Sequence, residues 1–243
     1  MLTAAWVLAG ALALQAPAAA TPSRPAERDP LSGLVHNLGR DLRDLPSSGT
    51  AVVLASGGAT ALLAHPADDD LNDWAVERGP AGYVRLGNLL GDGWFQGGAA
   101  IGTYLAGRLG GDPDLMHLGS DLIRSQVLNA VLTRSIKLVA QRNRPHGGPD
   151  SMPSGHASAA FASATVIQSH YGWKAGAPAY AAAGFMAWSR VRDDRHWLTD
   201  VIIGGAIGTL AGRTVTRGHR AQWTIAPAAT TQSASLIVIH TFR

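Results

Sequence analysis

Six apolar segments of helical length recur along the chain, and they constrain its fold more than any other feature. They cover approximately residues 50–64, 94–107, 118–140, 156–170, 176–190 and 198–214. Apolar segments of this length are typical of helices rather than strands. We therefore expect an all-α fold, a helical bundle of about six core helices within residues 49–216, which suits a single domain.

Small residues in the last segment indicate close helix packing. Gly204-Gly205, Gly208 and Gly212 repeat at near-four-residue spacing, which lets a neighbouring backbone approach. None of the internal segments is an uninterrupted, strongly apolar run of about twenty residues, the length that spans a bilayer, and the mean hydropathy is only +0.06. Membrane spanning therefore does not follow from the apolar pattern alone.

The N-terminal 48 residues predict a targeting segment and an amphipathic helix. Residues 1–20 have an apolar stretch and a small-residue cleavage site, as in a signal peptide. An uncleaved membrane anchor is the alternative. Residues 21–48 predict a Pro-rich linker and then a helix with leucines on one face. This helix lies on a membrane or packs against the helical core; both remain open.

The C-terminal tail, residues 217–243, changes its pattern. Gln222–Pro227 and Ser233–Phe242 alternate or are β-branched, which predicts a short C-terminal β-hairpin. The hairpin would cap the core or add a strand to a partner's sheet.

Three ordered fragments in the second half of the chain carry the chemistry. Lys137 precedes Arg144-Pro145 in a K-x6-R-P pattern, and Pro153-Ser154-Gly155-His156 follows. The third fragment has the pattern S-R-x5-H-x3-D, with Arg190, His196 and Asp200. Together they supply three cations, two histidines and a carboxylate, the groups needed to bind a phosphate and attack its phosphorus without a metal.

Several of these residues suit phosphate binding. The guanidinium groups of Arg144 and Arg190 can each bind two phosphate oxygens, while Lys137 acts as a point charge. Ser154 precedes an apolar stretch, so we expect it near the N-cap of a helix whose free backbone N–H groups bind an anion. Gly155 would let that backbone approach the phosphate closely.

The two histidines and the aspartate suit covalent catalysis. A neutral His196 can attack phosphorus and form a phosphohistidine. Asp200, four residues later, would hold the other ring nitrogen and stabilise the developing positive charge. His156 would protonate the leaving alcohol and then activate water.

The three fragments together resemble the signature of the type 2 phosphatidic acid phosphatase (PAP2) superfamily, which also contains bacterial acid phosphatases and vanadium haloperoxidases. The resemblance implies a PAP2-like helical core, the same roles for the matching residues, no cofactor and no metal. The chain is most similar to the bacterial membrane-associated lipid phosphatase branch. It departs from many members at Asp194, where they carry Gly.

Composition narrows the function further. The net charge of +3 is diffuse and there is no Lys/Arg run, so nucleic acid is not an expected partner. The absence of Cys excludes thiolate chemistry and disulfides. We expect an exported phosphatase for a lipid phosphate or pyrophosphate, in a bacterial inner membrane facing the periplasm, or periplasmic.

Four alternatives stay open at this point. They are a soluble acid phosphatase of broad specificity, a lipid phosphotransferase, a vanadate-dependent haloperoxidase and a non-catalytic binding protein.

Overall fold

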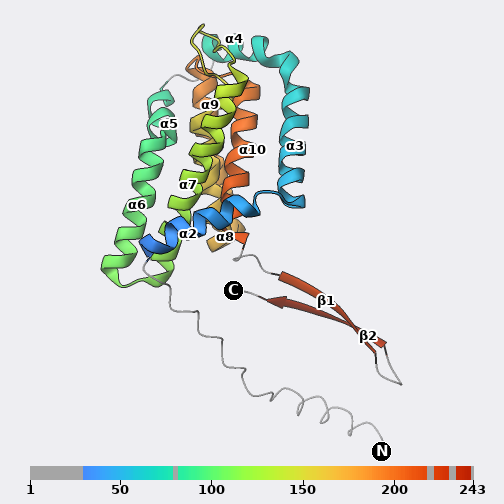
Figure 1. Ribbon diagram of the computed structural model, residues 1–243. Coiled ribbons are helices and arrows are strands. Elements are labelled where there is room, and N and C mark those ends of the chain that lie inside the picture. The colour runs from blue at the N-terminus through green and yellow to red at the C-terminus, as the bar shows by residue number, and fades with distance from the viewer. Residues whose placement is uncertain (1–29, 79–81, 218–221, 230–233, 242–243) are drawn as a thin grey trace, which may run out of the picture.

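The computed structural model describes residues 30–78, 82–217, 222–229 and 234–241 (Figure 1). The expected signal peptide or anchor, residues 1–20, lies outside the described residues.

The described chain is a helical bundle, as expected. Its helices are α2 (Pro30–Asp44), α3 (Ser48–Ala64), the short 3₁₀-helix η1 (His65–Ala67), α4 (Asp68–Arg78), α5 (Val84–Gly91), α6 (Gly93–Gly110), α7 (Pro113–Ala140), α8 (Gly155–Tyr171), α9 (Trp173–Arg192) and α10 (Leu198–Val215). Each predicted apolar segment falls in one of the helices α3 and α6 to α10. The estimate of about six core helices is approximate, because α4 and α5 are further short helices that the apolar pattern did not indicate.

Local sequence signals set where the helices begin. Ser47 accepts a hydrogen bond from the N–H of Thr50 at 3.1 Å and caps α3. Asp92 caps α6 in the same way through the N–H of Trp94, at 2.8 Å. Such side chains satisfy backbone donors that have no partner within the helix.

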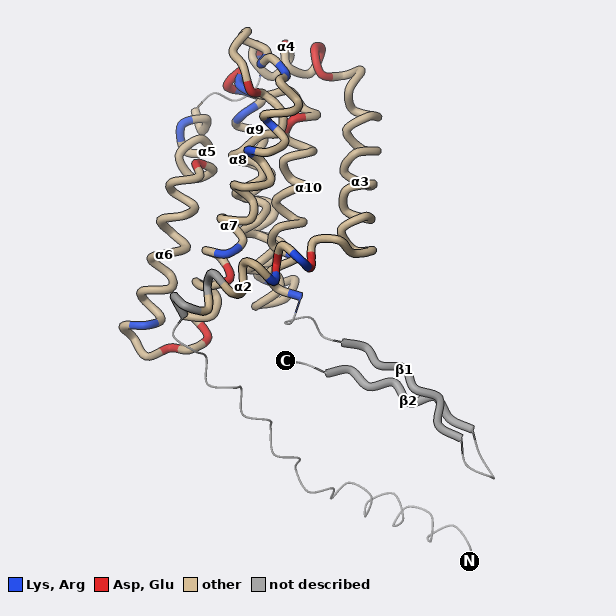
Figure 2. The backbone as a smooth tube through the Cα atoms, viewed as in Figure 1, with Lys and Arg blue, Asp and Glu red and all other residues tan. Residues whose placement is uncertain are grey.

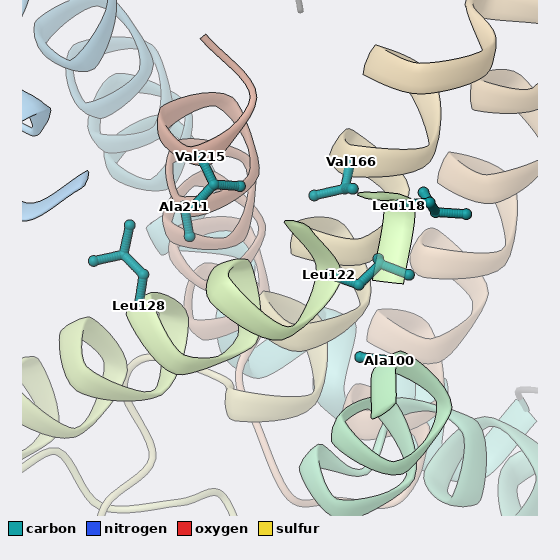
Figure 3. Close-up of a cluster of buried hydrophobic side chains, with 7 residues drawn as sticks. All are labelled: Ala100, Leu118, Leu122, Leu128, Val166, Ala211 and Val215. Atoms are coloured by element: carbon teal, nitrogen blue, oxygen red, sulfur yellow. The ribbon is translucent and has the colours of Figure 1, made fainter. Parts of the chain in front are cut away.

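The apolar core lies where α6, α7, α8 and α10 meet (Figure 3). The buried side chains there come from all four helices: Ala100, Leu118, Leu122, Leu128, Val166, Ala211 and Val215. Because these side chains are apolar and buried, their removal from water stabilises the bundle.

The glycine repeat of α10 brings this helix against the backbone of α8. A Cβ atom on Gly208 would lie 2.0 Å from the carbonyl oxygen of Ser158, and one on Gly204 would lie 2.6 Å from that of Ser154. At the same end, the N–H of Ser154 donates to the carbonyl of Asp200 at 2.9 Å. The packing therefore places the beginnings of α8 and α10 side by side.

The amphipathic helix α2 packs against the core. It lies across the end of the bundle opposite α4 (Figure 1). The carboxylate of Asp41, 3% exposed, accepts two hydrogen bonds from Arg124 of α7, at 2.6 and 2.8 Å. Of the two alternatives for this helix, packing against the core is therefore the one found.

The predicted C-terminal β-hairpin is not supported as part of the helical bundle. Strands β1 (Gln222–Ala229) and β2 (Ala234–Thr241) pair antiparallel, with Gln222 opposite Thr241. Figure 1 shows them extending away from the helices instead of capping the core. The alternating residues therefore account for the pairing of the two strands, but they do not place the strands in the helical core.

Much of the outer surface of the bundle is apolar. By length and hydropathy, one helical stretch in the described part, Ser48–Arg78, could cross a membrane, and only 6% of its most apolar window is buried. Large apolar side chains are also exposed on other helices, among them Trp94, Leu109, Leu138, Val139 and Trp173. Figure 2 shows the charged residues gathered toward the two ends of the bundle.

The α8–α10 contact yields a first prediction. Gly208→Ala should destabilise the protein by about 1–3 kcal/mol, because the added methyl group meets backbone atoms that cannot move independently. The measurement is the free energy of unfolding in detergent, or the Tm where unfolding is irreversible.

Gly205→Ala is the matched control for this substitution. Its Cβ would meet the ring of Phe161 at 3.5 Å, an ordinary contact, so the stability should stay near that of the wild type. Equal effects of the two substitutions would contradict the importance of the close approach at Gly208.

Candidate active site

The three sequence fragments converge at the end of the bundle where α4 lies (Figure 1). Lys137 is in the last turn of α7, Ser154 caps α8 and Arg190 is near the end of α9. His196 lies in the short connection to α10, and Asp200 lies in the first turn of α10. Fragments up to 63 residues apart in the chain thus share one site, because neighbouring helices begin and end there.

Three cations line this site. The ammonium group of Lys137 donates to the carbonyls of Asp150 and Ser151, and Arg144 donates through Nε to the carbonyl of Pro149 at 3.0 Å. Burial lowers the pKa of Arg190 to about 10, and the positive charges of Arg195 and Arg144 act in the same direction. Clustered like charges of this kind favour an anion between them.

Arg190 is held firmly yet keeps one donor unused. The residue is 8% exposed, and its Nη1 donates to Oδ1 of Asn88 on α5 at 2.6 Å. Its Nε is buried and has no hydrogen-bond partner among the described residues. A buried donor without a partner costs free energy, so this atom is suited to an acceptor on a bound ligand.

His196 and Asp200 are buried next to each other. They are 3% and 0% exposed, and Nδ1 of His196 lies 3.6 Å from Oδ2 of Asp200. This distance is an ion-pair contact that exceeds a good hydrogen bond, and Nδ1 has no hydrogen-bond partner within the described ranges. The carboxylate is placed to stabilise positive charge on the ring, and Nε2 is left for chemistry.

Without a bound ligand, the neutral form of both site histidines is favoured. Burial lowers the pKa of His196 to about 4, although Asp200 opposes that shift. Burial and the positive charge of Arg190 lower the pKa of His156 to about 4, against the opposing charge of Asp92. A neutral imidazole is the nucleophilic form of His196.

Asp200 is fixed by partners on both carboxylate oxygens. Oδ2 accepts from the hydroxyl of Ser151 and from the N–H of Trp197, the latter at 2.9 Å. Oδ1 accepts from Nη1 of Arg142 at 2.9 Å. The carboxylate therefore cannot turn away from His196 without breaking several hydrogen bonds.

Arg142 and Asp68 support the site, and the sequence analysis missed both. Arg142 lies inside the K-x6-R-P fragment, and its Nη2 donates to Oδ2 of Asp68 at 2.8 Å. Asp68 also accepts from the N–H and hydroxyl of Thr199, at 3.0 and 2.7 Å. The one sequence feature that could have indicated Asp68 is the acidic run Asp68–Asp70. Within this run, only contacts with residues distant in the chain distinguish the buried Asp68 from its exposed neighbours.

The departure at Asp194 has a local explanation. Its φ of +57° is in the left-handed region, where Gly is favoured and Asp is tolerated. The carboxylate accepts from Nδ2 of Asn72 on α4 at 2.9 Å. The neighbouring arginines pair with Asp193 instead: Arg190 lies 3.5 Å and Arg195 lies 3.7 Å from its carboxylate.

A cavity of about 540 Å³ opens from the cations along α7. Lys137, Arg144 and His156 line one end, and Arg134 is also on its wall. Within the described ranges, no three His, Asp or Glu side chains are grouped so that they could hold a metal ion. Besides the cations and His156, the lining contains the polar side chains of Gln126, Asn129 and Thr133 and the carboxylates of Asp92 and Asp150.

The second half of the chain is similar to a known protein family. Residues 115–224 match the model of the PAP2 superfamily, a range that contains every predicted site residue. A segment of 75 residues is 41% identical to the lipid A 1-phosphatase of Porphyromonas gingivalis. That match covers 29% of this chain and 17% of the relative, so the chain spans less than a fifth of the relative's length.

Two solved structures are similar. The crystal structure of LpxE from Aquifex aeolicus is 20% identical with a TM-score of 0.54, covering 62% of this chain and 94% of that one. This similarity establishes a shared fold. The structure of a transmembrane PAP2 type phosphatidylglycerolphosphate phosphatase from Bacillus subtilis is also 20% identical, covering 78% and 94% of the two chains. Its TM-score of 0.47 is too low to support a further argument.

The support given by Asp68 can be tested by its loss. Asp68→Asn should destabilise the protein by about 3 kcal/mol, the low end for breaking a buried ion pair. The low end applies because Arg142 still forms its ion pair with Asp200 in this variant. Thermal unfolding in detergent measures this. Asp69→Asn, one residue further and exposed, is the control and should change little; an equal loss would mean that the first-turn charge of α4 matters rather than the Arg142 contact.

Proposed function

Because residues 115–224 match the model of the PAP2 superfamily, we propose that this chain is a metal-independent phosphatase that hydrolyses a phosphate monoester or pyrophosphate of a lipid. The observation that carries the proposal is a buried His196, backed by Asp200, beside three cations. This arrangement suits phosphoryl transfer, in which catalysis is mainly positioning and charge stabilisation.

In the first step, Nε2 of His196 attacks phosphorus and the bond to the leaving oxygen breaks. Lys137, Arg144 and Arg190 stabilise the charge on the three remaining phosphate oxygens. The N–H groups at the beginning of α8, near Ser154 and Gly155, add further donors. His156 gives its proton to the leaving oxygen, and phosphate stays covalently on His196.

In the second step, water attacks the phosphohistidine. His156, now neutral, takes a proton from the water, and the bond between phosphorus and Nε2 breaks. Inorganic phosphate leaves and both histidines return to their initial state. Asp200 stabilises the positive charge on the ring of His196 throughout.

The surface of the bundle supports a membrane location. Helix α3 has no Asp, Glu, Lys or Arg, and neither does α8. Their 17 residues each give a length of about 25 Å, close to the ~30 Å hydrocarbon core of a bilayer. The exposed apolar side chains favour a lipid environment over a soluble acid phosphatase. We propose an inner-membrane protein with the site near one surface, facing the periplasm.

The covalent step can be trapped. Wild-type protein in detergent with EDTA should release phosphate from phosphatidic acid or a related lipid, and quenching should leave acid-labile phosphate on the protein. His196→Ala should abolish both the release of phosphate and the acid-labile phosphate on the protein. Asp200→Asn should lower kcat strongly, while vanadate, which resembles the transition state, should still bind.

Two outcomes of this assay would contradict the proposal. Inhibition by EDTA would sink the metal-free mechanism. Label that persists in His196→Ala would place the covalent intermediate elsewhere.

The pKa of His156 generates a pH prediction. In the free enzyme the general acid is protonated only near or below pH 4, so kcat/KM should fall as pH rises above that value. A bound phosphate carries negative charge that favours protonated His156. The falling limb of kcat should therefore lie at higher pH than that of kcat/KM, since kcat reports the bound enzyme.

Measuring both parameters against pH tests this displacement. His156→Asn should lack the limb altogether, which assigns it to this residue. Coincident limbs in the wild-type protein would contradict the proposed role of His156.

A further inference from the structure

The cavity continues from the phosphate site along one polar face of α7. Gln126, Asn129, Thr133 and Lys137 are spaced three or four residues apart and all line it. Residues at this spacing share a helix face. From Lys137 to Asn129 the helix rises about 12 Å, so this wall extends well beyond the position of the phosphate.

Most polar groups on this wall already have partners. The amide nitrogen of Gln126 donates to the carbonyl of Ala159 and to the hydroxyl of Ser163, both at 2.9 Å. The hydroxyl of Thr133 lies 3.1 Å from that of Ser158 and 3.4 Å from Oδ1 of Asn129. These bonds hold the wall in place without a ligand.

Asn129 differs from its neighbours. It is 4% exposed and lines the cavity. Its Oδ1 accepts from Thr133, but its Nδ2 makes no hydrogen bond with any residue in the described part of the chain. Because Asn129 lines the cavity, its Nδ2 can donate a hydrogen bond to an acceptor on a ligand there.

The surroundings of Asn129 leave room for that acceptor. Ala130 and Ala159, both small, also line the cavity. In an acylated lipid phosphate, the strongest acceptors between the phosphate and the chains are acyl carbonyl oxygens. A polyprenyl chain offers no acceptor beyond its phosphates.

We propose that Asn129 binds an acyl carbonyl of the substrate, so that the enzyme selects acylated lipid phosphates over polyprenyl phosphates. This inference rests on the proposed function. It adds a second contact point to the phosphate site and makes Asn129 a specificity-determining residue.

The test compares two substrates that differ in the carbonyl. Dioctanoyl phosphatidic acid has ester carbonyls, and the dioctyl ether analogue has the same headgroup and chain length without them. Wild-type kcat/KM should favour the ester by about tenfold, the effect of one hydrogen bond. Asn129→Leu should reduce this ratio to about one.

A second pair of substrates tests an amide carbonyl on a sugar. N-acetylglucosamine 1-phosphate has this carbonyl and glucose 1-phosphate lacks it, so their kcat/KM values are compared in the same way. A preference for the N-acetyl sugar that Asn129→Leu removes would identify an amide-linked acyl group as the source. A preference confined to the glycerol ester would identify an ester-linked one.

Two controls separate specificity from folding. In Asn129→Leu, kcat/KM for p-nitrophenyl phosphate should fall less than kcat/KM for the diacyl ester, because this substrate has no acyl carbonyl for Asn129 to bind. Ser135→Leu, a polar-to-leucine change at an exposed position of α7, should keep the wild-type ester preference. If Asn129→Leu does not fold, Asn129→Ala serves in its place.

The outcomes are distinct. A wild-type protein without ester preference, a ratio unchanged by the substitution, or an equal loss with p-nitrophenyl phosphate would overturn the subsite. If the wild-type protein releases phosphate from none of the substrates, the proposed function fails. The Kd values of the two lipids for the same variants then test the carbonyl contact alone.

Discussion

The close approach of α8 to α10 is the contact on which the site depends. Glycines on α10 remove the side chains that would otherwise separate the two backbones, and Gly208 allows the tightest contact. This approach lets the N–H of Ser154 reach the carbonyl of Asp200. As a result, the beginning of α8, which we propose binds an anion, and the proposed catalytic pair His196 and Asp200 share one rigid base.

Charge-assisted hydrogen bonds connect this base to the other charged residues of the site and hold them in place. Asp200 is bound by Arg142, which comes from the connection after α7, and Arg142 is bound by Asp68 at the beginning of α4. Arg190 is held through Asn88 of α5. The two short helices therefore matter more than their size indicates, since each fixes a charged group of the candidate site. Such preorganisation is what electrostatic catalysis requires.

The same bundle separates two environments along its length. The site gathers charges at one end, whereas the outer faces of α3, α6 and α7 expose large apolar side chains. The cavity along α7 connects these environments, with cations at one end and small or amide side chains further along. A molecule with a phosphate at one end and acyl chains at the other matches that gradient.

Much of the fold could be predicted from the sequence, because it is encoded locally. The apolar segments specified the principal helices, and capping residues such as Ser154 marked where they begin. The pattern missed α4 and α5, which are short and polar or interrupted by Gly, so that tertiary contacts rather than periodicity stabilise them. It also indicated a C-terminal hairpin that is no part of the helical fold, since strand propensity alone provides no packing surface.

The candidate site divides in the same way. By itself the sequence determined which residue types were present, namely the three cations, two histidines and one aspartate in ordered fragments. Only the tertiary structure decided which carboxylates support them, selecting the buried Asp68 over the adjacent Asp69 and Asp70. It also decided that Asp194 turns to Asn72 and that Asn129 keeps a free amide in the cavity. The physical reason is that burial and hydrogen-bond partners depend on residues distant in the chain, whereas capping and helix periodicity depend on neighbours.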